Sequence, residues 1–437
     1  MRLRLSITTR KAVNRKQLPC ALSISNVMLY CRILLSVCFI MVLPGCIERQ
    51  LGTTTPQMET DKQYWVKVLL VEKTNTCKVM TPSSFTVEDT QSHTTQAQFD
   101  KFDYPISITI SAGKINIAHR SFTGSQLLII TDEPFIFNFN GNDYRGKLSL
   151  MVNSDSNSFD AINLVPLEPY LAGVVGAEMP SYWEPQALQA QAIAARTYCL
   201  SIKKEFDGKR PWDVKKTQSH QVYAGLKGET TTVWDAVNAT KGEVLVCKHP
   251  DGKEDIFPTY YSSSCGGHTE NSQYVFGDSF APLSGVACPY CKYAAKSYSF
   301  FWPMVTYNQA EVSSRLVKRY SKLKPLEQII DIIPARQSDY GDFSRYTLFK
   351  LIGSTNKTDF LRAEDLRLTI DPTGFQLRST ICTILKTGDK WTFMSGRGWG
   401  HGVGMCQCGA QAMARQGKNS NQILNYYYPG SRILKIY

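Results

Sequence analysis

The sequence lacks the short motifs that mark several large classes of enzyme. It contains no G-x-x-x-x-G-K-[ST] phosphate-binding loop. The glycines at positions 398, 400, 402 and 404 alternate with other residues, so they do not form a G-x-G-x-x-G fingerprint, and no βαβ unit with a later acidic residue follows them. The segment Ser262-Ser-Ser-Cys-Gly-Gly is not a G-x-S-x-G nucleophile elbow. These absences argue against a dinucleotide-binding protein, a P-loop enzyme and an α/β-hydrolase.

The first 45 residues contain no acidic residue. The formal net charge of the whole chain is +12, and it falls to +5 without the seven basic residues of this segment, so the remainder is only mildly basic. Such a balance suits attraction to an anionic cell wall or membrane surface. We find no clustered basic helix of the kind that indicates nucleic-acid binding, and we expect no nucleic-acid partner. The seven residues are Arg2, Arg4, Arg10, Lys11, Arg15, Lys16 and Arg32.

The apolar run Ile33–Leu43 has eleven residues, which is too short to span a bilayer as a helix and is typical of the core of a signal peptide. Leu43-Pro-Gly-Cys46 follows and resembles a bacterial lipobox. We therefore predict a signal peptide over residues 1–45, lipidation at Cys46, and an exported, membrane-anchored lipoprotein facing the periplasm or cell wall. The alternatives are an ordinary signal peptide and a short anchor. A start at Met28 would give a tidier signal peptide.

Residues 46–61 are polar and rich in threonine, and we interpret them as a tether. Residues 62–165 alternate β-branched and polar residues, which predicts a β-rich accessory domain. Gly141-Asn142-Asp143 is typical of a hairpin turn between the two strands that flank it. The predicted strands cover Tyr64–Val71, Ile106–Ile110, Lys114–Ala118, Gln126–Thr131, Phe135–Asn140 and Lys147–Val152.

The rest of the chain is organised around Tyr170–Tyr198. This stretch begins as an apolar run that contains one carboxylate, Glu178. A turn is predicted at Met179-Pro-Ser, and a helix is predicted to begin near Pro185. An apolar stripe formed by Leu188, Ala192, Ala195 and Cys199 predicts one face of that helix, and Gln191 and Arg196 lie off the stripe and are expected to face a cleft. A glutamate in apolar surroundings is expected to have a raised pKa, which suits a general acid. The alternative is a surface glutamate before an ordinary helix.

Residues 396–409 form a second unusual stretch, with six glycines in fourteen residues enclosing Arg397, Trp399 and His401. So many glycines predict unusual backbone angles, or a backbone that approaches a ligand closely. A cysteine nucleophile at Cys265 with His401 as its base is a further alternative, although nothing in the sequence fixes the distance between them.

Together these stretches resemble the SpoIID/LytB family, named for the stage II sporulation protein D and an amidase enhancer. The ordered blocks that carry the resemblance span residues 160–437, and the fold that we expect is a mixed, multi-domain α+β protein with a catalytic region over residues 166–437. The blocks are Gly173–Met179, Ala190–Tyr198, Gln221–Gly225, Ser262–Thr269, Leu377–Thr380, Gly398–Met405, Gly409–Gln411 and Tyr427–Gly430.

The resemblance implies a lytic transglycosylase that cleaves the β-1,4 bond between N-acetylmuramic acid and N-acetylglucosamine in peptidoglycan glycan strands from which the peptides have been removed, and that leaves 1,6-anhydro ends. Glu178 would be the general acid and base, and Glu184 is the next candidate. The other matched residues would bind the sugars or line the cleft, unless their roles are structural; they are Gln191, Arg196, Gln221, Tyr223, Trp399 and His401. No cofactor is required for this chemistry.

The alternative function is a non-catalytic glycan-binding protein that stimulates a cell-wall amidase, as the LytB name implies. In either case the partners expected by analogy are peptidoglycan, a cell-wall amidase, and the membrane through the lipid anchor. The sequence does not distinguish sporulation, division at the septum and general cell-wall remodelling.

A further group of potential metal ligands consists of Cys265, His268, Cys288 and Cys291, of which the last two form a C-x-x-C pair. Thiolates and an imidazole at these separations predict a structural zinc site; a disulfide and free buried cysteines are the alternatives. The glycine-rich stretch adds cysteines at positions 406 and 408 that can approach this group.

Some family members carry a zinc site directly before the Gln-Val-Tyr block. Lys215, Ser219 and His220 stand at the corresponding positions of this chain, so we do not expect that zinc here. Residues 301–395 show mixed patterns without evident chemistry: helices are predicted at Asn308–Arg319 and Arg362–Leu368, and strands at Tyr346–Ile352, Gly374–Leu385 and Trp391–Met394. Short helices are predicted at Ala410–Arg415 and Asn421–Tyr428, followed by a terminal strand, Ser431–Tyr437.

Overall fold

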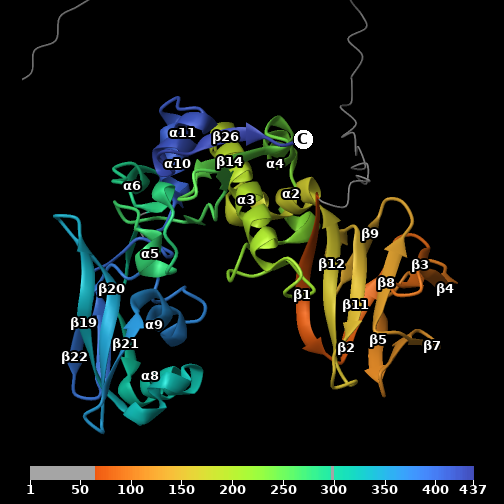
Figure 1. Cartoon of the computed structure of the whole chain (residues 1–437), viewed down its shortest axis with the longest axis horizontal. Helices are drawn as coiled ribbons and strands as arrows, with labels where there is room; N and C mark the ends of the chain where they lie inside the picture. Colours follow the sequence, from red (N-terminus) through yellow and green to blue (C-terminus); the bar gives the residue numbers. More distant parts are fainter. Residues whose placement is uncertain (1–63, 297–299) are drawn as a thin grey trace, which may run out of the picture. The chain divides into compact units, whose positions relative to one another are not determined.

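The computed structural model describes residues 64–296 and 300–437 (Figure 1). The signal peptide, lipobox and tether predicted for residues 1–61 lie outside the described residues. The described part combines helices with several sheets, which confirms the predicted α+β class. Within it, no helix is long and apolar enough to cross a membrane.

Residues 65–166, together with the short strand β13 from further along the chain, form two sheets with a shared apolar core. One sheet has the strand order β13-β1-β12-β11-β8-β3-β4 and the other has the order β10-β9-β2-β5-β6-β7. Strand β5 shows why these segments are strands: Ile106, Ile108 and Ile110 are buried, and the polar residues between them are exposed. The bounds are β1 Trp65–Thr74, β2 Thr76–Met80, β3 Phe85–Asp89, β4 Thr94–Phe99, β5 Ile106–Ser111, β6 Lys114–Ile117, β7 Arg120–Thr123, β8 Gln126–Thr131, β9 Ile136–Phe139, β10 Asn142–Arg145, β11 Lys147–Val152, β12 Phe159–Pro166 and β13 Val214–Lys215.

The predicted hairpin has a different second strand. After β9 the chain turns at Asn140 and Gly141, which both have positive φ, and continues into β10, which pairs with β9. The segment Lys147–Val152, predicted as the second strand of this hairpin, is instead β11. It pairs with β8 and β12 in the other sheet. The glycine turn was read correctly, but alternation alone does not specify which strand is the partner.

The apolar run before Glu178 is helix α2 (Leu167–Glu178), and it follows β12 without a loop. Helix α3 (Pro185–Phe206) begins at the predicted proline. Besides α2, its main contacts are with α4 (Thr231–Ala239), α10 (Gln407–Arg415), α11 (Ser420–Tyr427) and β14 (Glu243–Lys248). Helix α3 therefore lies inside the first core, and most of its residues are buried. Strand β14 pairs with β15 (Glu254–Ile256) and β26 (Arg432–Lys435).

A second core lies within residues 302–393. It contains two three-stranded sheets, β18-β23-β22 and β19-β20-β21, with helices α8 and α9 (Figure 1). The helices agree with the prediction, but most of Gly374–Leu385 is irregular and β19 was not predicted. The bounds are β18 Val305–Asn308, α8 Gln309–Arg319, η4 Ser321–Leu326, β19 Ile329–Asp339, β20 Ser344–Gly353, β21 Thr358–Arg362, α9 Ala363–Ile370, β22 Thr383–Thr387 and β23 Lys390–Met394.

The chain enters and leaves the second core through a two-stranded ribbon. Strand β17 (Phe301–Trp302) pairs antiparallel with β24 (Gly396–Arg397). A Cβ atom on Gly396 would lie 2.0 Å from the Trp302 ring, so only glycine fits at this crossing. The remaining short elements are η2 Gly225–Gly228, β16 Tyr261–Ser262, α5 Ser272–Val275, η3 Ala281–Leu283, α6 Cys291–Ala294 and β25 Met405–Cys406.

Candidate active site

Glu178 is the last residue of helix α2, and its side chain is half-buried. Its Oε1 atom accepts a hydrogen bond of 2.8 Å from the backbone N–H of Val222, and the side chain of Gln407 is a second hydrogen-bond partner. Burial raises the pKa of the Glu178 carboxyl above its ordinary value, and these two hydrogen bonds offset part of that rise. The negative end of the helix dipole also disfavours the charged form at this position. The carboxyl group is thus biased toward the protonated form that a general acid needs.

The Gln221-Val-Tyr segment holds the Val222 N–H in place through side chains that are themselves buried. Gln221 accepts a hydrogen bond of 3.0 Å from the Tyr170 hydroxyl, and its amide donates to the Ala195 carbonyl at 3.2 Å. The Tyr223 hydroxyl donates to Asn163 Oδ1 at 3.0 Å. In this structure Gln221 and Tyr223 are buried, and these polar atoms are used inside the first core rather than in a cleft, which favours the structural alternative for both residues.

Arg196 also has a structural position rather than one facing a cleft. Its side chain is fully buried and binds Glu168 with two hydrogen bonds, of 3.0 Å to Oε1 and 2.6 Å to Oε2. A third hydrogen bond of 3.1 Å reaches the Glu243 carbonyl. The sequence predicted that Arg196 faces a cleft because it lies off the apolar stripe of the helix. That reasoning holds for a helix with one exposed side, whereas other elements cover α3 on several sides.

Gln191 is fully buried and belongs to the same network as Glu178. Its Oε1 atom lies 3.4 Å from Gln407 Nε2, so Gln407 connects it to the carboxyl group. The Gln191 Nε2 atom has no hydrogen-bond partner among the described residues. Gln407 and the Val222 N–H were not identified from the sequence. The available signal was the position of Gln407 inside the glycine-rich stretch, where α10 begins.

The glycine-rich stretch has the unusual backbone that was predicted. Gly398, Gly400, Gly402 and Gly404 all have φ between 69° and 101°. The close neighbours of this backbone are protein groups: a Cβ atom on Gly404 would lie 1.9 Å from the Tyr260 carbonyl oxygen. The glycines therefore serve the packing of the stretch against the core.

His401 is held in a single neutral form by this stretch. Its Nδ1 atom accepts a hydrogen bond of 3.0 Å from the Val403 N–H, so the proton lies on Nε2, which is 2.9 Å from the Tyr261 carbonyl. Burial lowers the pKa of His401 to about 4. With both ring nitrogens occupied, His401 is unsuited to act as a base for Cys265.

Trp399 is half-buried and keeps one aromatic contact with the exposed Phe375, at 5.6 Å between ring centroids. The Arg378 guanidinium lies over the Trp399 ring at 4.4 Å. Glu184 precedes α3 and is exposed, and its backbone N–H donates to Gln411 Oε1. Of the residues predicted to bind sugar, Trp399 combines partial exposure with a large aromatic ring, the kind of side chain that packs against a sugar.

The predicted group of metal ligands changes by one member. The sulfur atoms of Cys265, Cys288, Cys291 and Cys406 all lie within 4.8 Å of one another, and all four residues are buried. His268 lies outside this group: its Nδ1 atom is 2.7 Å from the Thr269 carbonyl, and its ring stacks on Tyr340. The fourth cysteine comes from the glycine-rich stretch.

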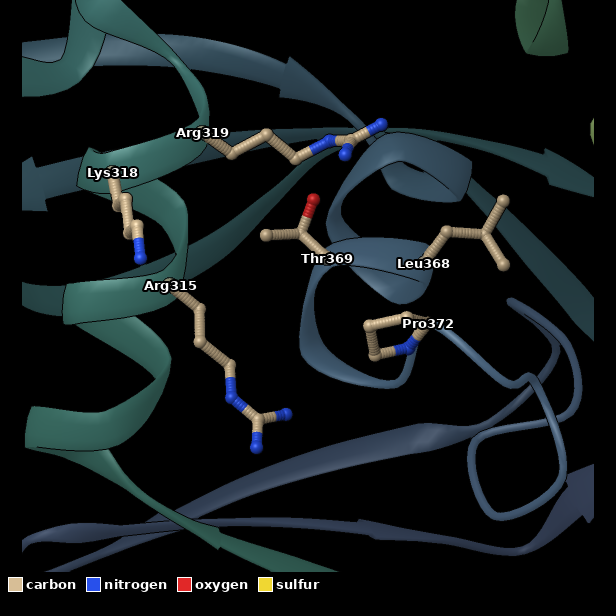
Figure 2. Close-up of a pocket in the computed structure, with 6 residues that line it drawn as sticks. All are labelled: Arg315, Lys318, Arg319, Leu368, Thr369 and Pro372. Atoms are coloured by element: carbon tan, nitrogen blue, oxygen red, sulfur yellow. The ribbon is translucent and has the colours of Figure 1, made fainter. Parts of the chain in front are cut away.

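A pocket on the second core contains none of these motif residues. Helix α8 contributes three cationic side chains, and the opposite wall comes from α9 and the residues after it (Figure 2). Arg315 is already bonded to Glu311 and to the Ile370 carbonyl. We therefore place the candidate active site at Glu178. The pocket is lined by Arg315, Lys318, Arg319, Leu368, Thr369 and Pro372.

Comparison with known proteins extends this description. The family model for SpoIID, described as stage II sporulation protein, matches residues 155–247, which contain α2, Glu178 and the Gln221-Val-Tyr segment. An uncharacterized protein from Brachyspira hyodysenteriae is 34% identical over 298 residues, which are 68% of this chain and 74% of that protein. Stage II sporulation protein D from Bacillus subtilis is 29% identical over 289 residues, which are 62% of this chain and 76% of that protein.

The amidase enhancer from Bacillus subtilis is 31% identical over 365 residues, which are 75% of this chain. The chain spans about half the length of that relative, 49% of it. The family model, the extent of these matches and the sequence blocks brought together around Glu178 all agree. The chain belongs to the SpoIID family of stage II sporulation proteins.

Proposed function

We propose that this protein is a lytic transglycosylase of peptidoglycan in which Glu178 acts first as general acid and then as general base. The observation that carries the proposal is the surroundings of Glu178: a half-buried carboxyl with a raised pKa, held by an N–H and an amide rather than by a cation. To protonate a leaving group, a general acid must carry its proton and must be accessible to the substrate.

In the first step, the Glu178 carboxyl donates its proton to the glycosidic oxygen between N-acetylmuramic acid and N-acetylglucosamine. The bond from that oxygen to C1 of the muramic acid breaks, and positive charge develops on C1 and the ring oxygen. Glu178 is left ionised. The N–H of Val222 stabilises this carboxylate for the time that it carries the charge.

In the second step, the ionised Glu178 takes the proton from the C6 hydroxyl of the same muramic acid. The C6 oxygen attacks C1, which closes a 1,6-anhydro ring and restores the protonated carboxyl. The reaction consumes no water, so it needs no second carboxylate to activate one. The sequence blocks that match the family contain Glu178 as their one carboxylate.

A half-buried Trp399 offers an apolar ring face for a sugar, and we assign it to substrate binding. Gln191 and Gln407 orient the acid, and His401, Gln221, Tyr223 and Arg196 maintain the structure around it. We propose that the substrate is glycan from which the peptides have been removed, and that Cys46 carries a lipid that keeps the protein at the membrane.

A second candidate function is favoured by one comparison. Because a relative at 31% identity is named an amidase enhancer, a glycan-binding protein that stimulates a cell-wall amidase is the alternative. Both functions would use the same surface, so glycan binding alone does not separate them.

The test is the product that the purified protein forms. Peptidoglycan glycan strands, with and without their peptides, are incubated with the protein and analysed by mass spectrometry. The proposal expects 1,6-anhydro ends from peptide-free strands. Products with water added at C1 would contradict the mechanism. If neither substrate gives anhydro ends and the protein still raises the turnover of an amidase, the enhancer function is correct.

A further inference from the structure

Four cysteines converge from three separate segments of the first core. Cys265 follows β16, Cys291 begins α6 with Cys288 just before it, and Cys406 ends β25 immediately before α10. Their side chains are at most 1% exposed. All four sulfur atoms lie within 4.8 Å of one another. Four sulfur atoms this close together can all reach one ion placed between them.

The separation of the sulfur atoms distinguishes a metal site from a disulfide. The Sγ atoms of Cys265 and Cys291 are 3.9 Å apart. Tetrahedral zinc with Zn–S bonds of about 2.3 Å places its sulfur ligands about 3.8 Å from one another. A disulfide brings two sulfur atoms to about 2.05 Å, and all four cysteines are free in the structure.

Two polar groups contact sulfur atoms of the cluster. The backbone N–H of Cys265 points to Cys406 Sγ at 3.2 Å. The Tyr427 hydroxyl lies 3.1 Å from Cys288 Sγ, and that is its one hydrogen bond among the described residues. Donors aimed at sulfur stabilise metal-bound thiolates, and such outer contacts accompany most metal sites.

We propose that Cys265, Cys288, Cys291 and Cys406 bind one zinc ion in a tetrahedral site of four thiolates. Four sulfur ligands in this geometry are typical of zinc, and they close the coordination sphere. Because no position is left for water or substrate, the role of the ion is structural. His268, the ligand expected from its closeness to Cys265 in sequence, is not part of the site.

The position of Cys406 gives this zinc a consequence for the active site, and this step rests on the proposed function. Cys406 is followed directly by Gln407, whose side chain bonds to Glu178 and Gln191. The ion would join the segment after β16 to the start of α10, and so fix the place of Gln407. Loss of zinc is therefore expected to weaken glycan cleavage through Gln407 while Glu178 itself is intact.

The chain offers a matched control. Cys408 is buried two residues after Cys406 but does not belong to the cluster. The full-length chain is purified under reducing conditions, and its metals are measured by elemental analysis. We expect about one zinc per chain in the wild type and in Cys408→Ser, and a loss of most of that zinc in Cys291→Ser.

A second measurement does not depend on the folding of a variant. Titration of the native wild-type protein with an organomercurial should release the zinc, detected with a metal-binding dye, as the four thiolates react. A protein without zinc whose thiols titrate freely would overturn the proposal, as would iron in place of zinc or a disulfide between two of the four cysteines. Because these readouts measure metal, they hold whether or not the protein cleaves glycan.

Discussion

The two ends of helix α2 carry the same residue type in opposite surroundings. Glu168, in the first turn, is bound by the guanidinium of the fully buried Arg196 and also contacts the Tyr437 hydroxyl. Glu178, ten residues later, has an N–H and an amide as partners and no cation within ion-pair distance among the described residues. The helix dipole favours the charge at the first position and opposes it at the second.

This difference explains how one helix supplies both a structural and a chemical carboxylate. The carboxylate that is paired with Arg196 joins α2 to α3. A carboxyl group with neutral donors and partial burial keeps its proton longer and can give it away. The residue type is therefore less informative than the charge of its partner. Four measurements can sharpen or break this comparison.

The largest expected effect is on glycan cleavage by Glu178→Gln. The substitution keeps the shape of the side chain and removes the transferable proton, so we expect turnover to fall by about a hundredfold to ten-thousandfold while glycan binding is retained. Formation of anhydro ends measures it. Glu184→Gln, at an exposed position six residues further on, is the control and should keep wild-type turnover. If the two variants exchange these results, Glu184 is the acid.

Arg196→Met should act on stability. Removing the guanidinium leaves Glu168 charged, buried and without its main partner, which typically costs about 3–5 kcal/mol of unfolding free energy. Urea denaturation measures the loss. The double variant Glu168→Met/Arg196→Met removes both charges and is expected to recover much of it. A single variant as stable as the wild type would show that the two ends of α2 do not differ in the way described.

The pH dependence of stability should reflect Glu178. Because its pKa is raised in the folded protein, the folded state binds this proton more tightly than the unfolded state does. The free energy of unfolding should therefore fall as the pH rises from the ordinary glutamate pKa to the raised one. The difference between wild type and Glu178→Gln, measured by urea denaturation over that range, isolates this contribution. If the free energy of unfolding of the wild type minus that of Glu178→Gln rises with pH over this range, the pKa of Glu178 is lowered in the folded protein and the prediction is wrong.

The smallest expected effect is that of Gln407→Leu. The hydrogen bond from Gln407 lowers the pKa of Glu178, so its removal should raise that pKa further. The alkaline limb of the pH–activity profile should move to higher pH, and turnover at the optimum should change less than in Glu178→Gln. Gln189→Leu, on a half-buried position of α3, is the control. An unmoved limb would show that Gln407 does not act on the carboxyl group.

The sequence was informative where a pattern is local. The break at Met179-Pro-Ser, the start of α3 at Pro185 and the positive φ angles of the glycine-rich stretch follow from residue types over a few positions. The α+β class followed from the same patterns. Glu178 stood out as a lone carboxylate in apolar sequence, but its role as the acid came from the family resemblance and stays a prediction.

The sequence was misleading where long-range packing decides. Arg196 lies off the apolar stripe of α3, yet that face is covered and the side chain is fully buried. His268 is near Cys265 in the chain, but Cys406 is near it in space. The second core was also not predicted, because apolar periodicity shows that a face is buried and not which core it enters.

The two paired strands β17 and β24 are far apart in the sequence, and this separation has a consequence during synthesis. Residues 303–395 are interposed between Trp302 and Gly396, and they have a core of their own that can close as soon as they have left the ribosome. Gln407 and α10 are translated only after them. The nascent chain therefore carries Glu178 for more than half of its length before the amide that orients the carboxyl exists. The complete active site can therefore form only when translation is nearly finished. A chain that ends soon after residue 396 contains Glu178 but lacks Gln407.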